Sequence, residues 1–95
     1  MIIAQLSISP LGKGTSVSKY VKIAIDVLKK EQITFQTNAM GTVLETKTLE
    51  TLFHIVQKVH NAVLATGAKR IITELKIDDR RDKNATITSK LASLK

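Results

Sequence analysis

The segment Ile2-Ile-Ala-Gln-Leu-Ser-Ile-Ser9 opens the chain with side chains that alternate in character along a period of two. Its even-numbered residues are all apolar, and its odd-numbered residues are polar after Ile3. This pattern is typical of a strand with one buried face. Pro10 is expected to end the strand, and Gly12 and Gly14 then indicate a loop. The chain therefore begins with a strand whose even-numbered side chains face a core.

Two amphipathic helices are predicted further along the chain. The first follows Thr15 and Ser16, which offer capping oxygens, and it should fade near Glu31. The second is capped by Thr48, with Glu50 in a first turn that favours acidic groups, and Gly67 is expected to stop it. Their predicted apolar stripes are Tyr20, Val21, Ala24, Val27 and Leu28 in the first helix, and Leu52, Val56, Val59 and Val63, with Phe53 and Leu64 beside them, in the second.

Strand-like alternation returns in three further segments. Residues 33–39 and 42–46 are separated by a turn at Gly41 and should form a hairpin. Residues 70–78 form a last strand, and a short helix is expected at about residues 85–94. The order is βαββαβ followed by a helix, which predicts an α+β, ferredoxin-like sandwich with a four-stranded antiparallel sheet. We expect one domain spanning residues 1–95, with both long helices on one face.

The opposite face of the predicted sheet is polar. If Leu44 of the third strand points to the core, Glu45 joins this face. Such a face is either simply solvated, as antiparallel sheets commonly are, or it forms a site that recognises a small molecule. The side chains expected there are Gln5, Ser7, Ser9, Thr34, Gln36, Asn38, Ile72, Glu74, Lys76 and Asp78.

Charge and composition weigh against several classes of partner. The net charge is +7, but the lysines are scattered, as on a solvated surface. RNA-recognition proteins of this architecture stack bases on aromatics of the two central strands, which here carry none. Tyr20, Phe35 and Phe53 all fall on predicted core stripes. Nucleic acid is therefore a disfavoured partner. A membrane is also disfavoured, because no apolar run approaches the roughly 18 residues of a membrane span.

Catalytic and metal-binding patterns are sparse. The chain has no cysteine, which excludes disulfides, thiol nucleophiles and cysteine-ligated metals. His54 and His60 are six residues apart on one helix, so they lie about 120° apart and cannot share a metal. The sequence contains no Walker loop and no GxGxxG motif. We therefore expect neither an enzyme nor a metal site.

Three segments resemble the thiamine-binding YkoF-like family of small proteins. They are Ser7-Ile-Ser-Pro-Leu-Gly12 with Ser16-Val-Ser-Lys-Tyr-Val21, then Met40-Gly-Thr-Val-Leu-Glu45, and finally Lys76-Ile-Asp-Asp-Arg-Arg-Asp82. The resemblance implies a ferredoxin-like protomer that forms homodimers or homotetramers. It also implies binding of thiamine or its hydroxymethylpyrimidine part, without catalysis and with no other cofactor.

The ligand-binding residues that this resemblance and the polar face suggest are Ser7, Gln36, Asn38, Gly41, Thr42, Glu45 and Asp78. Glu45 and Asp78 would balance the ligand's charge or accept from its amino group, and Gly41 and Thr42 would let backbone approach closely. The role of Arg80, Arg81 and Asp82 stays open. The alternative is an assembly or regulatory module without a dedicated ligand. A cytoplasmic location is expected, because the first ten residues lack a signal-peptide pattern.

Overall fold

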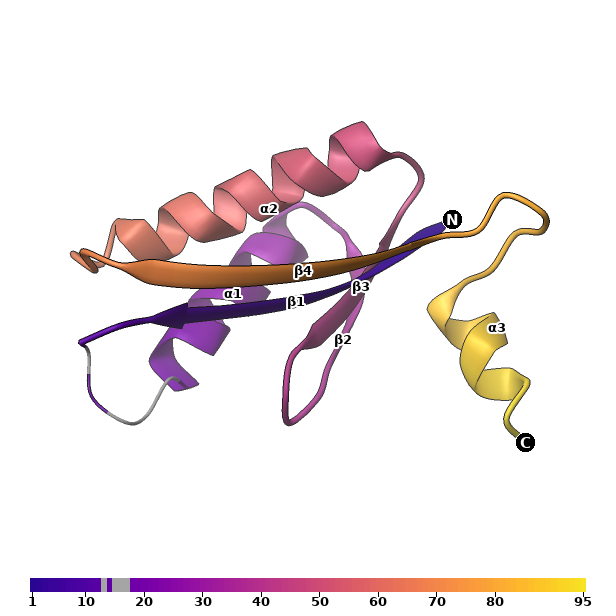
Figure 1. The fold of residues 1–95 in the computed structure, drawn as a ribbon, viewed down its shortest axis with the longest axis horizontal. Coiled ribbons are helices and arrows are strands. Elements are labelled where there is room, and N and C mark those ends of the chain that lie inside the picture. The colour runs from indigo at the N-terminus through magenta and orange to yellow at the C-terminus, as the bar shows by residue number, and fades with distance from the viewer. Residues whose placement is uncertain (13, 15–17) are drawn as a thin grey trace.

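The computed structural model describes residues 1–12, 14 and 18–95, and it confirms the predicted element order (Figure 1). A four-stranded sheet carries two long helices, and a short helix follows at the C-terminal end. The strands are β1 (Ile2–Pro10), β2 (Thr34–Thr37), β3 (Thr42–Thr46) and β4 (Ile71–Asp79); the helices are α1 (Ser18–Lys30), α2 (Leu49–Leu64) and α3 (Ile87–Ala92). The ferredoxin-like α+β fold is therefore present.

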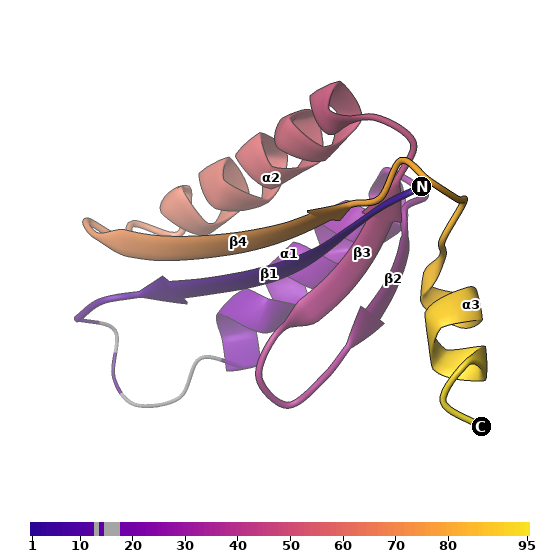
Figure 2. The ribbon, with the colours of Figure 1, turned by 45° about the vertical axis from the view of Figure 1, so that its right-hand side comes forward.

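The sheet has the order β2-β3-β1-β4, and every neighbouring pair is antiparallel (Figure 2). β1 pairs with β4 along its whole length, from Ile2 opposite Asp79 to Pro10 opposite Ile71. Its pairing with β3 is shorter and ends where Leu6 faces Thr42. Among the described residues, the second half of β1 therefore has a strand partner on one side only.

Pro10 is the last residue of β1, so the strand ends where the sequence predicted. Successive residues of a strand direct their backbone groups to opposite neighbours. The Leu6 carbonyl oxygen lies near Gly41, on the β3 side, so the even-numbered residues of β1 direct their backbone groups to that side. Pro10, which lacks a backbone N–H, therefore presents its nitrogen to the side where β3 has already ended. A proline is tolerated at such an edge.

Both long helices cover the face that carries the even-numbered side chains of β1 (Figure 1). Leu28 of α1, Leu44 of β3 and Leu52 of α2 are completely buried there. The burial of Leu44 settles the orientation of β3: Leu44 faces the helices and Glu45 the opposite side. The core therefore lies between the two helices and the two central strands.

The buried stripe of α2 differs from the predicted one. Ile55 is buried, although the predicted stripe did not include it, and Val56 is half-buried and packs against the core. Phe53 is 52% exposed, so its expected core position was wrong. The reason is the position of α1. Lys58 of α2 forms an ion pair with Glu31 after α1, which places α1 on the flank of α2 near Ile55. Tyr20 is buried and Phe35 packs against the core, as predicted.

The helix ends follow ordinary capping chemistry. Thr48 caps α2 as predicted, since its hydroxyl accepts from the Thr51 backbone N–H at 3.1 Å. α2 ends at Leu64, and Gly67 takes a positive φ of 95° shortly afterwards, a conformation that favours glycine. The predicted cap at Thr15 and Ser16 lies outside the described residues. Across the described part of the chain, no helix is long and apolar enough to cross a membrane.

Candidate functional site

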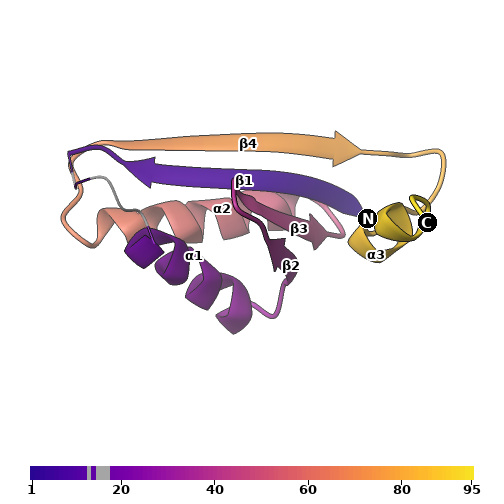
Figure 3. The ribbon, with the colours of Figure 1, turned by 90° about the horizontal axis from the view of Figure 1, so that it is seen from below.

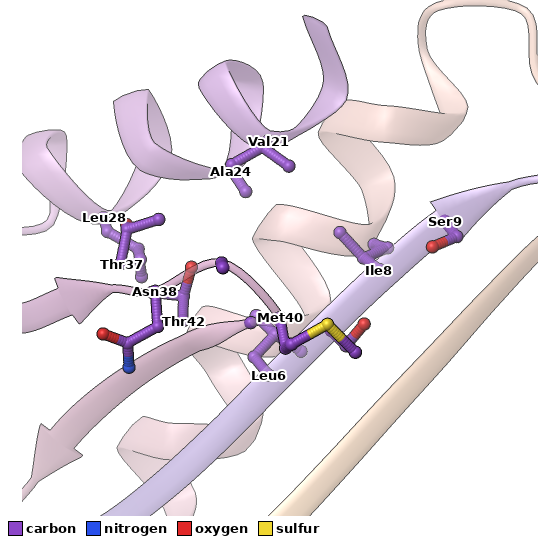
Figure 4. Close-up of a pocket in the computed structure, with 13 residues that line it drawn as sticks. Leu6, Ile8, Ser9, Val21, Ala24, Leu28, Thr37, Asn38, Met40 and Thr42 are labelled. Atoms are coloured by element: carbon purple, nitrogen blue, oxygen red, sulfur yellow. The ribbon is translucent and has the colours of Figure 1, made fainter. Parts of the chain in front are cut away.

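A cavity of about 200 Å³ lies between α1, the second half of β1 and the β2–β3 turn (Figure 4). Val21, Ala24 and Leu28 form the wall from α1. The opposite side is formed by β1 residues 6–9 and by residues 37–42, which include the turn. Met40 of the turn is 85% exposed, and Figure 4 shows its side chain extending toward β1. The cavity therefore opens at the side of the molecule where β3 is short.

The cavity exists because β3 ends before β1 does. Beyond the Leu6–Thr42 pair, no strand of the described residues lies beside this edge of β1. The chain turns at residues 38–41, where the Asn38 N–H donates to the Gly41 carbonyl oxygen at 2.8 Å. Ile8 directs its backbone N–H and C=O to this edge, as Leu6 does. In the described part of the chain these two groups have no strand partner on that side. The cavity is thus bordered by one backbone donor and one backbone acceptor on a rigid strand.

The remaining lining is mostly apolar, with one buried hydroxyl residue. Leu6 and Ile8 belong to the core face of β1, and Thr42 is only 7% exposed. Gly41 approaches β1 closely: a Cβ atom there would lie 3.2 Å from the Leu6 carbonyl oxygen. The absence of a side chain at Gly41 therefore allows the turn to lie against the strand. Such a lining suits a flat, mainly apolar ring with a few polar atoms.

The structure divides the residues that the sequence suggested as a site into two groups. Ser7, Asn38, Gly41 and Thr42 line the cavity. Gln36 is exposed and lies opposite Val43 on the face without α1 and α2. Asn38 lies in the turn, outside β2, and Thr42 faces the helices together with Leu44. The suggested residues therefore do not form one site on the polar face.

Glu45 and Asp78 lie at the other end of the sheet and contact the C-terminal segment. Oε2 of Glu45 accepts from the Ile87 backbone N–H at 2.8 Å, and Asp78 pairs with Lys90 at 2.6 Å. Ile3 lies between them in the sheet, directly opposite both residues, and is 9% exposed. These two carboxylates therefore hold α3 beside a buried apolar residue.

The arginine-rich segment after β4 forms two local ion pairs. Arg80 contacts Asp82 at 2.6 and 2.9 Å, and Arg81 contacts Asp79 at 2.8 and 2.7 Å. The guanidinium groups lower the pKa of both carboxyl groups, and the carboxylates raise the pKa of both arginines. A second hollow of about 310 Å³ touches Arg80 and Arg81. Both guanidinium groups already have partners, so this hollow is a poorer binding site.

The two histidines do not meet. His60 Nδ1 lies 2.7 Å from the Thr73 hydroxyl of β4, while His54 is exposed on α2. Within residues 1–12, 14 and 18–95, no three His, Cys, Asp or Glu side chains lie close enough together to hold a metal.

Sequence reasoning missed the α1 wall and Met40. The first-helix stripe contains Val21, Ala24 and Leu28, but the pattern only indicated that they face inward. The one available signal was the early end of β3, because the predicted strand at residues 42–46 is shorter than the predicted strand at residues 2–9. That signal gives the position of a gap, and only the tertiary structure shows what lines it.

Comparison with known proteins places the chain in a family. The family described as thiamine-binding protein matches residues 4–95. A UPF0045 protein of Methanocaldococcus jannaschii is 48% identical over 93 residues, covering 98% of this chain and 91% of that protein. The UPF0045 protein YqgV of Bacillus subtilis is 39% identical over 99 residues, covering 99% and 94%.

Solved structures agree in fold. The crystal structure of the Methanocaldococcus jannaschii protein superposes with a TM-score of 0.89 and covers 98% of this chain and 94% of that one. A Thermotoga maritima structure, named for thiamine biosynthesis or salvage, has the same fold at 17% identity, with a TM-score of 0.81 and coverage of 99% and 98%. By the extent and level of these matches, the chain belongs to the thiamine-binding protein family.

Proposed function

We propose that this chain binds thiamine, or its hydroxymethylpyrimidine part, without catalysing a reaction, and that the pyrimidine ring enters the cavity between α1 and β1. The observation that carries the proposal is the free edge of β1 at Ile8, which borders the cavity. The family to which the chain belongs is described as thiamine-binding. The name of the Thermotoga maritima structure points to the same vitamin.

The hydrogen-bonding groups of the ligand and of the strand edge are complementary. An aminopyrimidine has an amino donor beside a ring-nitrogen acceptor. A strand edge presents a backbone C=O beside a backbone N–H, spaced to pair with a neighbouring peptide. The ring can therefore take the place of the missing β3 residues opposite Ile8. The Thr42 hydroxyl, which both donates and accepts, can serve a further polar atom of the ring.

The volume of the cavity favours one ring over the whole vitamin. A cavity of roughly 150 Å³ is enough for a benzene molecule. The 200 Å³ available here therefore suits a single substituted six-membered ring. In bound thiamine, the thiazolium ring would then lie at the mouth of the cavity, near the exposed Met40.

Electrostatics also favour the pyrimidine part as the recognised group. No carboxylate is among the described residues that line the cavity, and Glu45 and Asp78 engage α3 instead. A chain with a net charge of +7 gives no long-range attraction to a cation. We therefore expect neutral hydroxymethylpyrimidine to bind at least as tightly as thiamine.

Calorimetric titration with each of the two compounds tests the proposal. Ala24→Leu should fill the cavity from the α1 side and abolish binding. Thr42→Val removes one hydroxyl and should weaken binding about fivefold, a loss of affinity that corresponds to roughly one net hydrogen bond. Thr34→Val is the matched control, since Thr34 is exposed on the opposite side of the sheet and its replacement should leave affinity unchanged.

Two results would count against this function. One is the absence of heat and of any thermal shift with either compound at millimolar concentration. The other is unchanged binding by a folded Ala24→Leu variant, which would place the ligand elsewhere. Folding of each variant is checked by circular dichroism.

A further inference from the structure

We propose that Met40 is a site of reversible oxidation, and that its sulfoxide closes the cavity to a ligand by accepting from the free backbone N–H of Ile8. The effect on affinity rests on the proposed function, whereas the modification and the new contact with Ile8 do not. The chain has two methionines and no cysteine, so Met1 and Met40 carry its only sulfur atoms. Two-electron oxidants act on such thioethers where they are exposed.

Met40 is the more accessible of the two methionines. It is 85% exposed, and it is not part of the hydrophobic core. Met1 is half-buried, and its amino group donates to Oδ1 of Asn84 at 2.6 Å. A hydroperoxide can therefore reach the Met40 sulfur without any opening of the fold.

The turn that carries Met40 lies beside the part of β1 that lacks a neighbour. β1 and β4 continue together past the β2–β3 turn (Figure 3), while the pairing of β1 with β3 ends at Leu6 and Thr42. Met40 and Ile8 both line the cavity, and the Met40 side chain extends from the turn toward β1 (Figure 4). A methionine side chain has three rotatable bonds and adapts its shape easily. Met40 is therefore placed to reach the strand edge across the mouth of the cavity.

As a thioether, Met40 leaves this edge open to a ligand. Thioether sulfur is only a weak hydrogen-bond acceptor. Among the described residues, the Ile8 N–H has no strand partner on this side, so it stays available to a ring nitrogen. A polarizable sulfur also makes favourable contacts with aromatic rings. The reduced side chain therefore suits a mouth that a pyrimidine ring must pass.

The oxidation transfers one oxygen atom from a hydroperoxide to the sulfur. The sulfur lone pair attacks the terminal oxygen, so that a S–O bond forms while the O–O bond breaks. The proton on the transferred oxygen passes to the leaving oxygen, which departs as water or an alcohol. Sulfur loses two electrons and the peroxide gains them. The product is a polar sulfoxide, which methionine sulfoxide reductases convert back to the thioether.

The sulfoxide oxygen and the Ile8 N–H are a matched acceptor and donor. A hydrogen bond between them holds the Met40 side chain across the mouth and removes the donor that the ring nitrogen requires. A ring that displaced this contact would also have to desolvate the sulfoxide oxygen. We expect the affinity to fall about tenfold. Thiamine and hydroxymethylpyrimidine share the same ring, so both should be affected.

The modification and the new contact are tested without a ligand. Wild type treated with hydrogen peroxide should gain about 16 Da for each oxygen atom, and peptide mapping should find Met40 oxidised well before Met1. Hydrogen exchange of the Ile8 amide, followed by NMR, should slow on oxidation. It should return to its first rate after treatment with reductases for both sulfoxide epimers. Met40→Leu keeps Met1 as its one oxidisable sulfur, so peroxide should leave its Ile8 exchange unchanged.

Calorimetric titration of the same samples tests the effect on affinity, with each protein compared with its own untreated form. Peroxide should weaken binding of both compounds by wild type about tenfold, and it should cause no change in Met40→Leu. Met40→Gln places a permanent amide oxygen near the position of the sulfoxide oxygen. This variant should bind as weakly, without treatment, as oxidised wild type does.

Three results would overturn the proposal. The first is oxidation of Met1 ahead of Met40. The second is unchanged Ile8 exchange after complete oxidation of Met40, which would exclude the contact. The third is unchanged affinity of an oxidised protein that binds when untreated. If untreated wild type binds neither compound, the proposed function fails, and the peptide map and the Ile8 exchange then decide the modification and its contact on their own.

Discussion

The backbone N–H of Ile87 donates to Oε2 of Glu45 at 2.8 Å, across 42 positions of the chain. The contact matters because α3 has six residues and none of them is buried. A helix of this length has no stability of its own in water, so its position depends on tertiary contacts. Glu45, with Asp78 and Lys90, therefore determines where the C-terminal segment lies.

Glu45→Ala is expected to release α3. Hydrogen exchange of the backbone amides in residues 87–92 should become faster, while exchange in β1 and α2 should stay the same. Glu45→Gln keeps an acceptor oxygen and should show a smaller effect. Ligand affinity should not change, since Glu45 lies outside the cavity. Unaltered exchange in α3 after the alanine substitution would show that other contacts hold it.

Ile55→Ala is expected to destabilise the fold more than Val56→Ala. Ile55 is 2% exposed, and truncating a buried isoleucine typically costs 2–5 kcal/mol. Val56 is only partly buried, so its truncation removes less contact area. Urea unfolding of both variants measures the difference. Equal losses would contradict the orientation of α2.

Replacing Glu31 is expected to change the dependence of stability on pH. Its hydrogen bond from Lys58 lowers the pKa of the Glu31 carboxyl below the usual 4.5. A carboxyl with a lowered folded-state pKa adds stability that is present above 4.5 and is lost as pH falls through its folded-state value. Because the pair is exposed, the effect is small.

The comparison is between wild type and Glu31→Gln, with the melting temperature followed from neutral to acid pH. The variant should melt slightly lower at neutral pH, and the two curves should converge below the pKa of Glu31. A constant gap at all pH values would mean that the substitution acts by packing and not by charge.

Thr48→Ala is expected to destabilise α2 by about 1 kcal/mol, the usual cost of losing an N-cap. The Thr48 hydroxyl accepts from the Thr51 N–H, and alanine leaves that donor without its partner. Thr48→Ser keeps the hydroxyl and should retain most of the stability. Denaturant unfolding distinguishes the two variants, and equal stability of all three proteins would argue against the cap.

The arrangement of strands and helices could be predicted from the sequence because it depends on local periodicity. The alternation at residues 2–9 and the Thr48 cap are both local signals, and the structure contains both elements. Phe53 shows the limit of such patterns. Its apolar character indicates burial, but the position of α1 leaves it half exposed.

The candidate site was less predictable, because it depends on contacts between residues that are distant in sequence. Ser7, Gly41 and Thr42 came from segment resemblance and do line the cavity. Glu45 and Asp78 have the right charge for a cationic ligand, but their partners Ile87 and Lys90 are distant in sequence. No local pattern indicates that a short C-terminal helix returns to these carboxylates.

The β2–β3 turn at residues 38–41 borders the cavity yet contributes nothing to the hydrophobic core. Insertions, deletions and substitutions in the turn are therefore largely uncoupled from folding, apart from Gly41, where a side chain would meet β1. On the proposed function, a change confined to this turn would alter ligand preference. In protein engineering, it is the segment in which a library of variants would alter selectivity at the least risk to the scaffold.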